Sequence, residues 1–379
     1  MLRLLIENIY PSKFRFVGTL MIVELKDVCE KETSNIRQKD LLDKKGDYPI
    51  YGASGLIGNV DFYRQETPYV AVVKDGAGIG RAMLLPAKSS VIGTMQYLIP
   101  KGNVLPEYLY YVVKNMHLEK YSSGATIPHI YFKYYKKEKF NLVDLDQQRK
   151  IISVFKKIED AIRKQRDELT NLDTLIKARF VEMFGDPGLV HRENKVCNLE
   201  NVAEVRSSHR IFTREFTKSG VPFYRGTEIS LLANGKEPIH SYYISKARYD
   251  EITKNDSKPK IGDLLMPSIC DKGQIWLVNT SKPFYYKDGR VLCISPNREK
   301  FNTIFFHQYM KMKSQIEYLK IGSGSTFAEF KIFQLKKLKI NIPPLKLQNE
   351  FASFVQQVDK SKVVNNLIMK YIISTRGAS

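Results

Sequence analysis

The stretch DQQRKIISVFKKIEDAIRKQRDELTNLDTLIKARFVEMFGDP, residues 146–187, contains no glycine or proline before Gly185. Its apolar residues recur at alternating steps of four and three, at Ile151, Phe155, Ile158, Ile162, Leu169, Leu172 and Ile176. This spacing of about 3.5 residues is typical of a coiled-coil seam, which the polar residue Gln165 interrupts once. Because Gly185-Asp-Pro187 ends the pattern, we predict one helix over 146–184, about 58 Å long.

The chain repeats this helix 200 residues further on. Without gaps, Ser122–Thr126 aligns with Gly322–Thr326, and Gln148 aligns with Gln348. The second seam contains Phe351, Val355, Val358, Met369 and Ile372, and it is interrupted by Lys362 and Asn365. Because a single helix cannot bury its own apolar stripe, we predict that the helices over 146–184 and 346–379 pack together as an antiparallel coiled coil. The alternative is that each helix lies on its own globular domain.

The segments that precede the two helices also repeat. Leu25–Val28 parallels Leu199–Val202, and Tyr48–Tyr51 parallels Val221–Tyr224. Three strand-like runs follow in the same order in both copies, at 69–73, 82–85 and 96–99 and at 263–266, 275–278 and 291–294. Helical patterns come next, at 106–116 and 303–312.

We therefore predict an α+β protein with a pseudo-two-fold repeat, in which two globular domains in tandem are separated by the two long helices. The predicted segments are an N-terminal extension over 1–20, globular domains over 21–145 and 185–345, a central helix over 146–184 and a C-terminal helix over 346–379.

The composition is that of a globular protein with excess positive charge. The 379 residues include 60 Lys and Arg against 40 Asp and Glu, a net charge of +20. This charge favours a polyanionic partner and excludes an acidic solvating protein. No apolar run approaches the roughly 20 residues of a membrane-spanning helix. Because the four cysteines are far apart, we predict a cytoplasmic protein with reduced thiols, without a metal site or a membrane association.

Two short motifs resemble catalytic ones, but their context differs. Gly76-Ala-Gly-Ile-Gly80 resembles a cofactor-binding glycine loop, yet a strand-like run follows it where such a loop opens a helix. Asn341-Ile-Pro-Pro-Leu345 separates the asparagine from the prolines and lacks the aromatic residue that would hold a flipped base. We therefore predict no catalytic residues and no cofactor. A compact methyltransferase that uses Gly76–Gly80 is an alternative, which cofactor binding in calorimetry would favour.

The order of these motifs resembles the specificity (S) subunit of type I restriction-modification systems. The residues that carry the resemblance are Tyr48–Gly55, the hairpin at Lys74–Gly80, the turns at Ser123–Thr126 and Ser323–Thr326, and Ile342–Leu345 with Gln348. The resemblance extends from Met21 to the C-terminus. The first copy departs from the family by lacking the two prolines before its helix, and the second by having Phe327-Ala328 where the family often has Ile-Pro.

The resemblance implies a non-catalytic subunit that supplies DNA specificity to a larger complex. Its two target-recognition domains would bind a bipartite, asymmetric site on double-stranded DNA, and it would recruit two methyltransferase (M) subunits and restriction or motor (R) subunits. The long helices would set the half-site separation, because groove faces recur once per helical turn. One alternative is a specificity-like subunit of another methyltransferase system. Another is a non-specific architectural protein, which competition with random DNA at raised salt would distinguish from a specificity subunit, because only the latter keeps a large sequence preference.

Polar and cationic residues in or beside the predicted turns are the candidate DNA contacts, because Arg pairs with guanine and Gln with adenine through two hydrogen bonds. In the first domain they are Tyr51, Ser54, Lys74, Arg81, Thr94 and Gln96. In the second domain they are Arg206, Ser207, His209, Arg210, Arg225, Thr227, Lys272 and Gln274. Candidates for a phosphate or partner contact recur in both copies, at Lys136, Lys137, Lys336 and Lys337. For docking of M subunits we expect exposed positions on the central helix, such as Arg163, Lys164 and Arg166.

Overall fold

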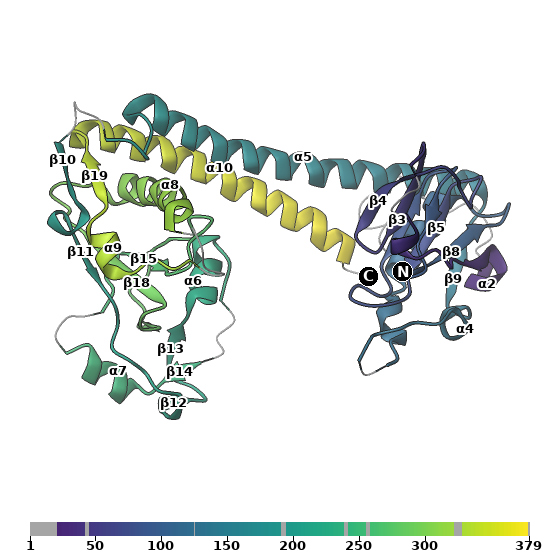
Figure 1. Cartoon of the computed structure of the whole chain (residues 1–379), viewed down its shortest axis with the longest axis horizontal. Helices are drawn as coiled ribbons and strands as arrows, with labels where there is room; N and C mark the ends of the chain where they lie inside the picture. The colour runs from purple at the N-terminus through teal and green to yellow at the C-terminus, as the bar shows by residue number, and fades with distance from the viewer. Residues whose placement is uncertain are drawn as a thin grey trace. The chain divides into compact units, whose positions relative to one another are not determined.

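The computed structural model in Figure 1 describes residues 21–41, 45–124, 126–190, 195–238, 242–254, 258–321 and 328–377, with side chains as far as residue 372. The chain divides into two compact units. Unit 1 comprises Met1–Gln165 and Ile368–Ser379, and unit 2 comprises Arg166–Leu367. The predicted extension over 1–20 and the turn at Gly322–Thr326 lie outside the described residues.

Unit 1 contains a four-stranded sheet with the order β2-β8-β5-β6, a three-stranded sheet with the order β4-β3-β7, and the strand pair β1-β9. Its strands are β1 (Met21–Glu24), β2 (Cys29–Thr33), β3 (Tyr48–Gly52), β4 (Gly55–Val60), β5 (Tyr69–Val73), β6 (Ala82–Leu85), β7 (Ser90–Val91), β8 (Met95–Pro100) and β9 (Lys139–Leu142). Its helices are α2 (Leu25–Val28), α3 (Pro106–Asn115), α4 (Phe132–Tyr135) and the first part of α5 (Leu145–Phe184), with the short 3₁₀ helices η1 (Gln38–Leu41) and η2 (Leu118–Tyr121).

Strand β5 is buried along its whole length because both faces of its sheet are covered. Successive side chains of a strand point to opposite faces, so Val70 and Val72 join the core formed with α3. Tyr69, Ala71 and Val73 join the core on the other face, which includes Val91 of β7. The first turns of α5 extend the α3 core, where Phe155 stacks on Tyr111 with ring centroids 4.6 Å apart.

Unit 2 repeats this plan. Its sheets have the orders β11-β18-β15-β16 and β12-β14-β13-β17, beside the strand pair β10-β19. Its strands are β10 (Lys195–Asn198), β11 (Ala203–Arg206), β12 (Phe216–Thr217), β13 (Val221–Tyr224), β14 (Tyr243–Ile244), β15 (Leu264–Pro267), β16 (Trp276–Leu277), β17 (Tyr285–Tyr286), β18 (Val291–Pro296) and β19 (Lys339–Ile342). Its helices are α6 (Gly226–Ala233), α7 (Lys246–Ile252), α8 (Thr303–Ile321), α9 (Ile332–Lys336) and α10 (Leu345–Gly377), the last ending outside this unit, with η3 (Leu199–Asn201) and η4 (Thr213–Glu215).

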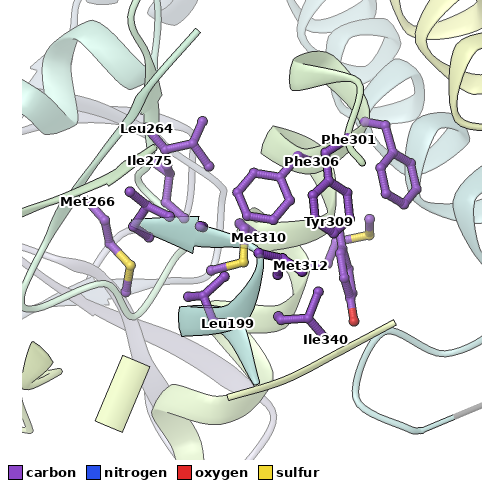
Figure 2. Close-up of a cluster of buried hydrophobic side chains, with 14 of the residues drawn as sticks. Leu199, Leu264, Met266, Ile275, Phe301, Phe306, Tyr309, Met310, Met312 and Ile340 are labelled. Atoms are coloured by element: carbon purple, nitrogen blue, oxygen red, sulfur yellow. The ribbon is translucent and has the colours of Figure 1, made fainter. Parts of the chain in front are cut away.

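The main core of unit 2 lies between its β15–β18 sheet and helix α8, as Figure 2 shows. Leu264 and Met266 of β15 face Phe306 and Met310 of α8 there. Helix α8 extends past the predicted 303–312 segment to Ile321. The two buried residues in this extension, Lys313 and Ser314, are polar and do not continue an apolar pattern.

Within unit 2, the long helices α5 and α10 pack side by side (Figure 1). The rings of Phe180 and Phe351 lie 5.5 Å apart, and the Lys362 ammonium lies 2.7 Å from the Asp173 carboxylate. Residue numbers fall along α5 as they rise along α10, so the two helices are antiparallel. The shared cluster contains Leu172, Ile176, Phe180, Phe184, Phe351, Val355 and Val358.

The predicted α+β fold, with two sheet regions and two long helices in contact, is therefore confirmed. Other predicted seam residues differ in their surroundings. Ile151 and Phe155 are buried by the core of unit 1, as the alternative of a helix lying on its own domain requires. Ile162 is buried, and Ile158, Leu169, Met369 and Ile372 are half-buried. The seam also continues through Phe180 and Phe184, which the heptad count did not include.

The same buried glutamine begins both long helices. The Gln148 side chain accepts a hydrogen bond from the Leu105 N–H at 2.8 Å and donates to the carbonyls of Asn103 and Val143. Gln348 makes the same three contacts, to the backbone of Lys300, Asn302 and Pro343. We call each arrangement a glutamine clamp. Because each clamp joins the start of a long helix to the loop before α3 or α8, it holds the helix to its own domain.

Candidate functional site

A basic cleft of about 470 Å³ lies in unit 1 between strand β2, strand β8 and helix α4. We call it the lysine cleft. Its lining residues are Lys31, Thr33, Lys74, Gln96, His129, Ile130, Tyr131, Phe132, Lys133 and Lys136. Lys31 and Gln96 are 65 positions apart in the sequence, and the strand order β2-β8-β5 brings them together.

A loop bound by backbone hydrogen bonds forms one wall of the lysine cleft. The Ile130 N–H donates to the Lys74 carbonyl and the Gly76 N–H donates to the Pro128 carbonyl, both at 2.9 Å. These bonds attach the loop before α4 to the hairpin between β5 and β6. The cleft is therefore a fixed feature of the unit 1 fold.

Aromatic rings and cations alternate at the mouth of the lysine cleft. The Lys133 ammonium lies 5.2 Å from the Tyr131 ring and 4.8 Å from the Tyr134 ring, and both tyrosines are exposed. The His129 ring packs against Tyr131 at 4.1 Å. Cations that bind phosphate, together with rings on which bases stack, are the usual equipment of a nucleic-acid surface. Of this group the sequence prediction included only the lysine at 74, the glutamine at 96 and the recurring lysine at 136.

Gln96 occupies a different environment from the one expected. It is 2% exposed and its amide donates to the Tyr135 hydroxyl. This burial places it at the floor of the lysine cleft, where it cannot reach into a DNA groove. We therefore correct its role from a base contact to a residue that shapes the floor.

The other candidates of the first domain lie around the same hairpin. The Arg81 guanidinium donates to the Ala53 carbonyl at 3.0 Å, which joins the β5–β6 turn to the β3–β4 turn. Tyr51 is half-buried in β3 and Ser54 is exposed in the turn. The Thr94 carbonyl accepts from the Lys74 N–H at 2.9 Å, so its backbone supports the cleft.

Arg206 of unit 2 has its charge compensated within the fold. Its side chain is 17% exposed and lies 3.2 Å from Glu204 and 3.4 Å from Asp263, and it donates to the Ser295 hydroxyl at 2.6 Å. Burial alone would lower the pKa of Arg206, but the nearby ionisable groups of Cys293, Tyr286, Glu204 and Asp263 outweigh it and raise the pKa. A base contact by Arg206 would break this network, so we correct its expected role to a structural one.

The segment after Arg206 is exposed and strongly basic. Residues 207–218 contain three Lys and Arg against one acidic residue. Arg210 and Arg214 are exposed, and their guanidinium carbons lie 5.2 Å and 5.3 Å from the Phe212 ring. His209 is also exposed, while the Ser207 hydroxyl accepts a hydrogen bond from the Gly289 N–H. We call residues 207–215 the arginine loop.

Arg225 lies over the Tyr242 ring at 4.6 Å and binds Glu228 at 3.1 Å. Burial raises the pKa of Glu228, but the hydrogen bonds from Arg225 outweigh it and lower that pKa overall. Thr227 is exposed at the start of α6.

Lys272 and Gln274 belong to the turn between β15 and β16, the counterpart of the β5–β6 hairpin. The Gln274 amide donates to Asp271 at 2.7 Å and its oxygen accepts from the Lys272 N–H. The structure therefore brings the second set of candidates, apart from Arg206, to three places: this turn, the start of α6 and the arginine loop.

The motifs that resembled catalytic ones are structural. Gly76, Gly78 and Gly80 have positive φ angles in the β5–β6 turn, and strand β6 follows them. Asn341 lies in strand β19.

Burial raises the pKa of the Cys29 and Cys293 thiols to about 12, which keeps them protonated and poorly nucleophilic at neutral pH.

Neither a candidate metal site nor a candidate membrane-spanning helix is found in the described part of the chain. No group of three or more His, Cys, Asp and Glu side chains is arranged there to hold a metal ion. No helix there combines the length and the apolar character that crossing a membrane requires.

Comparisons with known proteins agree with the duplicated architecture. Residues 18–171 and 191–369 each match the family model described as type I restriction modification DNA specificity domain. A protein of Haemophilus influenzae named as a type I restriction enzyme specificity subunit is 25% identical, over 87% of this chain and 84% of its own. The MjaVIII specificity subunit of Methanocaldococcus jannaschii is 22% identical, over 76% of this chain and 72% of its own.

Solved structures show the same fold. The S subunit of a type I restriction-modification system from M. genitalium matches with a TM-score of 0.55 at 13% identity, covering 97% of this chain and 96% of its own. A chain from a study of complex assembly and conformational transition in the type I system matches with a TM-score of 0.56 at 15% identity, covering 96% of this chain and 97% of its own.

Proposed function

The chain belongs to the type I restriction modification DNA specificity domain family, and from this premise we propose that its two units recognise the two unequal halves of a bipartite DNA site. It is the DNA specificity subunit of a type I restriction-modification system, a component that is not itself catalytic. DNA is its macromolecular target, and we expect it in the cytoplasm.

The observation that carries the proposal is a common scaffold with different surfaces. Both units have the same strand pair, the same main sheet order and the same glutamine clamp. The exposed basic surfaces differ, since unit 1 has the lysine cleft and unit 2 has the arginine loop. A repeated frame with two unlike binding surfaces suits two unlike half-sites, which gives an asymmetric target.

Phosphate and base contacts divide between different residue types in this proposal. Lys31 and Lys133 of the lysine cleft supply positive charge for the DNA backbone, which positions unit 1 without selecting a sequence. Lys74 also lines the cleft, although its ammonium lies 3.2 Å from the Asp75 carboxylate. Tyr51 of β3, with Ser54 and Arg81 of the neighbouring turns, is a proposed base contact of unit 1.

The proposed base contacts of unit 2 are Arg225 and Thr227 with His209 and Ser207. Arg210 is a proposed phosphate contact, and Lys272 and Gln274 form a second contact region. The recurring lysines at 136, 137, 336 and 337 stay candidates for phosphate or partner contact. Lys136 has the clearest support, because it lines the lysine cleft.

We further propose that methyltransferase (M) subunits, two in number, dock on what the two copies share, and that restriction or motor (R) subunits join through them. Arg163, Lys164 and Arg166 are exposed on α5, although Arg163 also binds Asp160 at 2.7 Å. Because these three side chains are exposed and positively charged, they can contact an acidic surface of a partner.

The test combines this chain with an M subunit of a type I system and maps methylated DNA positions by sequencing. We expect one bipartite, asymmetric motif. In variants that replace Ser54 and Arg81, or Arg225 and Thr227, by alanine, we expect relaxed selection in one half of the motif, a different half for each pair. Lys114→Ala is the control, because Lys114 is already paired with Glu159.

Methylation without a motif would instead support the non-specific architectural alternative. Relaxation of the same half by both variant pairs would contradict the assignment of one half-site to each unit. Modification that requires a methyltransferase outside the type I class would favour the alternative of a specificity-like subunit of another system.

A further inference from the structure

We propose that Phe212 is a DNA wedge, an apolar side chain that enters between two stacked base pairs and opens the step, while Arg210 and Arg214 bind the flanking phosphates. This inference rests on the proposed function, and it adds a recognition mode based on DNA deformation. Insertion of the Phe212 ring requires that the ring is exposed, that the backbone around it is rigid, and that cations lie on both sides of it.

The ring is exposed although its neighbour in the chain is not. Phe212 is 47% exposed, whereas Ile211 is 3% exposed and packs in the core with Val221, Phe223 and Tyr285. The arginine loop is therefore anchored at one residue and presents the next residue to solvent.

The backbone on both sides of Phe212 is fixed. Before it, the His209 N–H donates to the Tyr285 hydroxyl at 2.8 Å and the Ser208 hydroxyl donates to the Tyr286 carbonyl at 2.7 Å. At Phe212 itself, the N–H donates to the Glu215 carboxylate at 2.7 Å. Glu215 is held in turn by Arg248 at 2.8 Å. A wedge needs such support, because ordering a mobile loop on binding would cost affinity.

The local charge favours DNA. Arg210 and Arg214 both lie within 5.3 Å of the Phe212 ring, and Lys218 follows in the sequence. The one acidic residue of this segment, Glu215, is compensated by Arg248. Proteins that unstack a base step insert apolar residues such as Phe, and nearby cations neutralise the backbone there.

The arginine loop also lies in an accessible part of unit 2. It follows β11 and leads to β12, at the end of the unit away from α10 (Figure 1). Its hydrogen bonds to β17 and the loop after it attach it to the smaller sheet of the unit. The Phe212 ring is not part of the core between β15 and α8, so it can contact DNA without disturbing that core.

The first experiment measures unstacking directly in the complex with an M subunit. A duplex with the mapped motif carries 2-aminopurine at successive positions of each half-site. We expect fluorescence to rise at one step with the wild-type chain and with Phe212→Leu, and to stay low with Phe212→Ala. Affinity of Phe212→Ala for this duplex should fall by about tenfold, the scale of one lost ring–base contact.

The matched control is Phe333→Ala. Phe333 is a 61% exposed phenylalanine of α9 in the same unit, outside the arginine loop. We expect Phe333→Ala to keep the fluorescence rise and the affinity. Equal behaviour of the two alanine variants, or an unchanged rise in Phe212→Ala, would overturn the wedge.

A second measurement does not need the target sequence. A wedge unwinds DNA, so relaxing a closed circular plasmid with topoisomerase in the presence of the complex should change its linking number, less so with Phe212→Ala. If methylation mapping finds no motif but the plasmid is unwound in a Phe212-dependent way, the two-half-site proposal is rejected and the wedge is retained. If Phe212→Ala loses the M subunit but keeps full DNA binding, the loop is a protein-docking surface and the wedge is rejected.

Discussion

At the scale of single residues, a buried side-chain amide holds each long helix. Gln348 is fully buried and all three of its hydrogen bonds go to backbone groups. Gln348→Ala leaves one N–H and two carbonyls without their partner, so we expect unit 2 to lose about 2–4 kcal/mol of unfolding free energy. Urea unfolding followed by the fluorescence of Trp276, the only tryptophan, measures this loss.

Gln356→Ala is the control for this change, because Gln356 is exposed on the same helix. We expect its effect to stay within about 0.5 kcal/mol. Similar effects of the two substitutions would show that the glutamine clamp does not contribute to stability.

A second residue makes unit 2 sensitive to acid. Burial is the largest cause that lowers the pKa of His307 to about 4, and its Nε2–H donates to the Ile275 carbonyl at 2.8 Å. The unfolded chain, with a histidine pKa near 6.5, binds the proton more readily, so stability is complete above pH 6.5 and is lost as the pH falls toward 4.

Between pH 7.5 and pH 5 we therefore expect the unfolding free energy to fall by at most about 2 kcal/mol through His307. Urea titrations of the wild-type chain and of His307→Gln at both pH values separate this contribution from the rest. An equally steep fall in the variant would assign the acid sensitivity to other groups.

Residue roles were the part that the sequence predicted least well. The alignment of Gln148 with Gln348 showed that the position is shared, but two of the three backbone partners lie more than 40 residues away in each copy. Arg206 looked like a free cation because Asp263, its partner, is 57 positions further along the chain. Charge compensation of this kind depends on sheet order, which local patterns do not reveal.

At the scale of elements, the antiparallel pairing of α5 and α10 depends on an aromatic cluster in unit 2. Phe180 stacks on Phe305 and Tyr309 and meets Phe351 and Phe184 edge-on or tilted. We expect Phe180→Ala to destabilise unit 2 by about 3–5 kcal/mol, because it removes a large ring from a closed core. Denaturant unfolding monitored at Trp276 provides the measurement.

Val181→Ala is the neighbouring control, since Val181 is 49% exposed on the same turn of α5. We expect it to change stability by less than about 1 kcal/mol. A mild effect of Phe180→Ala would mean that the helix pair is held mainly elsewhere along its length.

Elements were predicted better than residues because periodicity is local. The three strand runs of each copy appear as β5, β6 and β8 and as β15, β16 and β18. The exceptions are informative. Phe180 and Phe184 lie beyond the counted heptads, and α8 extends past the predicted end through the buried polar residues Lys313 and Ser314. A pattern that counts apolar residues does not register such positions.

At the scale of the whole molecule, the net charge of +20 predicts salt-dependent binding to DNA. Each lysine that neutralises a phosphate contributes about one unit to the slope of the logarithm of the association constant against the logarithm of salt concentration. For Lys133→Ala we therefore expect binding that is weaker for all DNA sequences and a slope smaller by about one. Fluorescence anisotropy over a series of KCl concentrations determines the slope.

Lys114→Ala again serves as the control, because its charge is already paired within unit 1. An unchanged slope for Lys133→Ala would remove that lysine from the proposed phosphate contacts. The sequence indicated a polyanionic partner from net charge alone, but only the fold gathers four lysines around one cleft.

The short strand pairs have a consequence for how such proteins diversify. In unit 1, β1 pairs with β9 so that Met21 is opposite Leu142, and in unit 2, β10 pairs with β19 so that Lys195 is opposite Ile342. The entry and exit of each globular block are thus adjacent. A gene segment that encodes such a block can be exchanged for a foreign one with both joints already aligned, so new target preferences can arise by recombination without redesign of the helices.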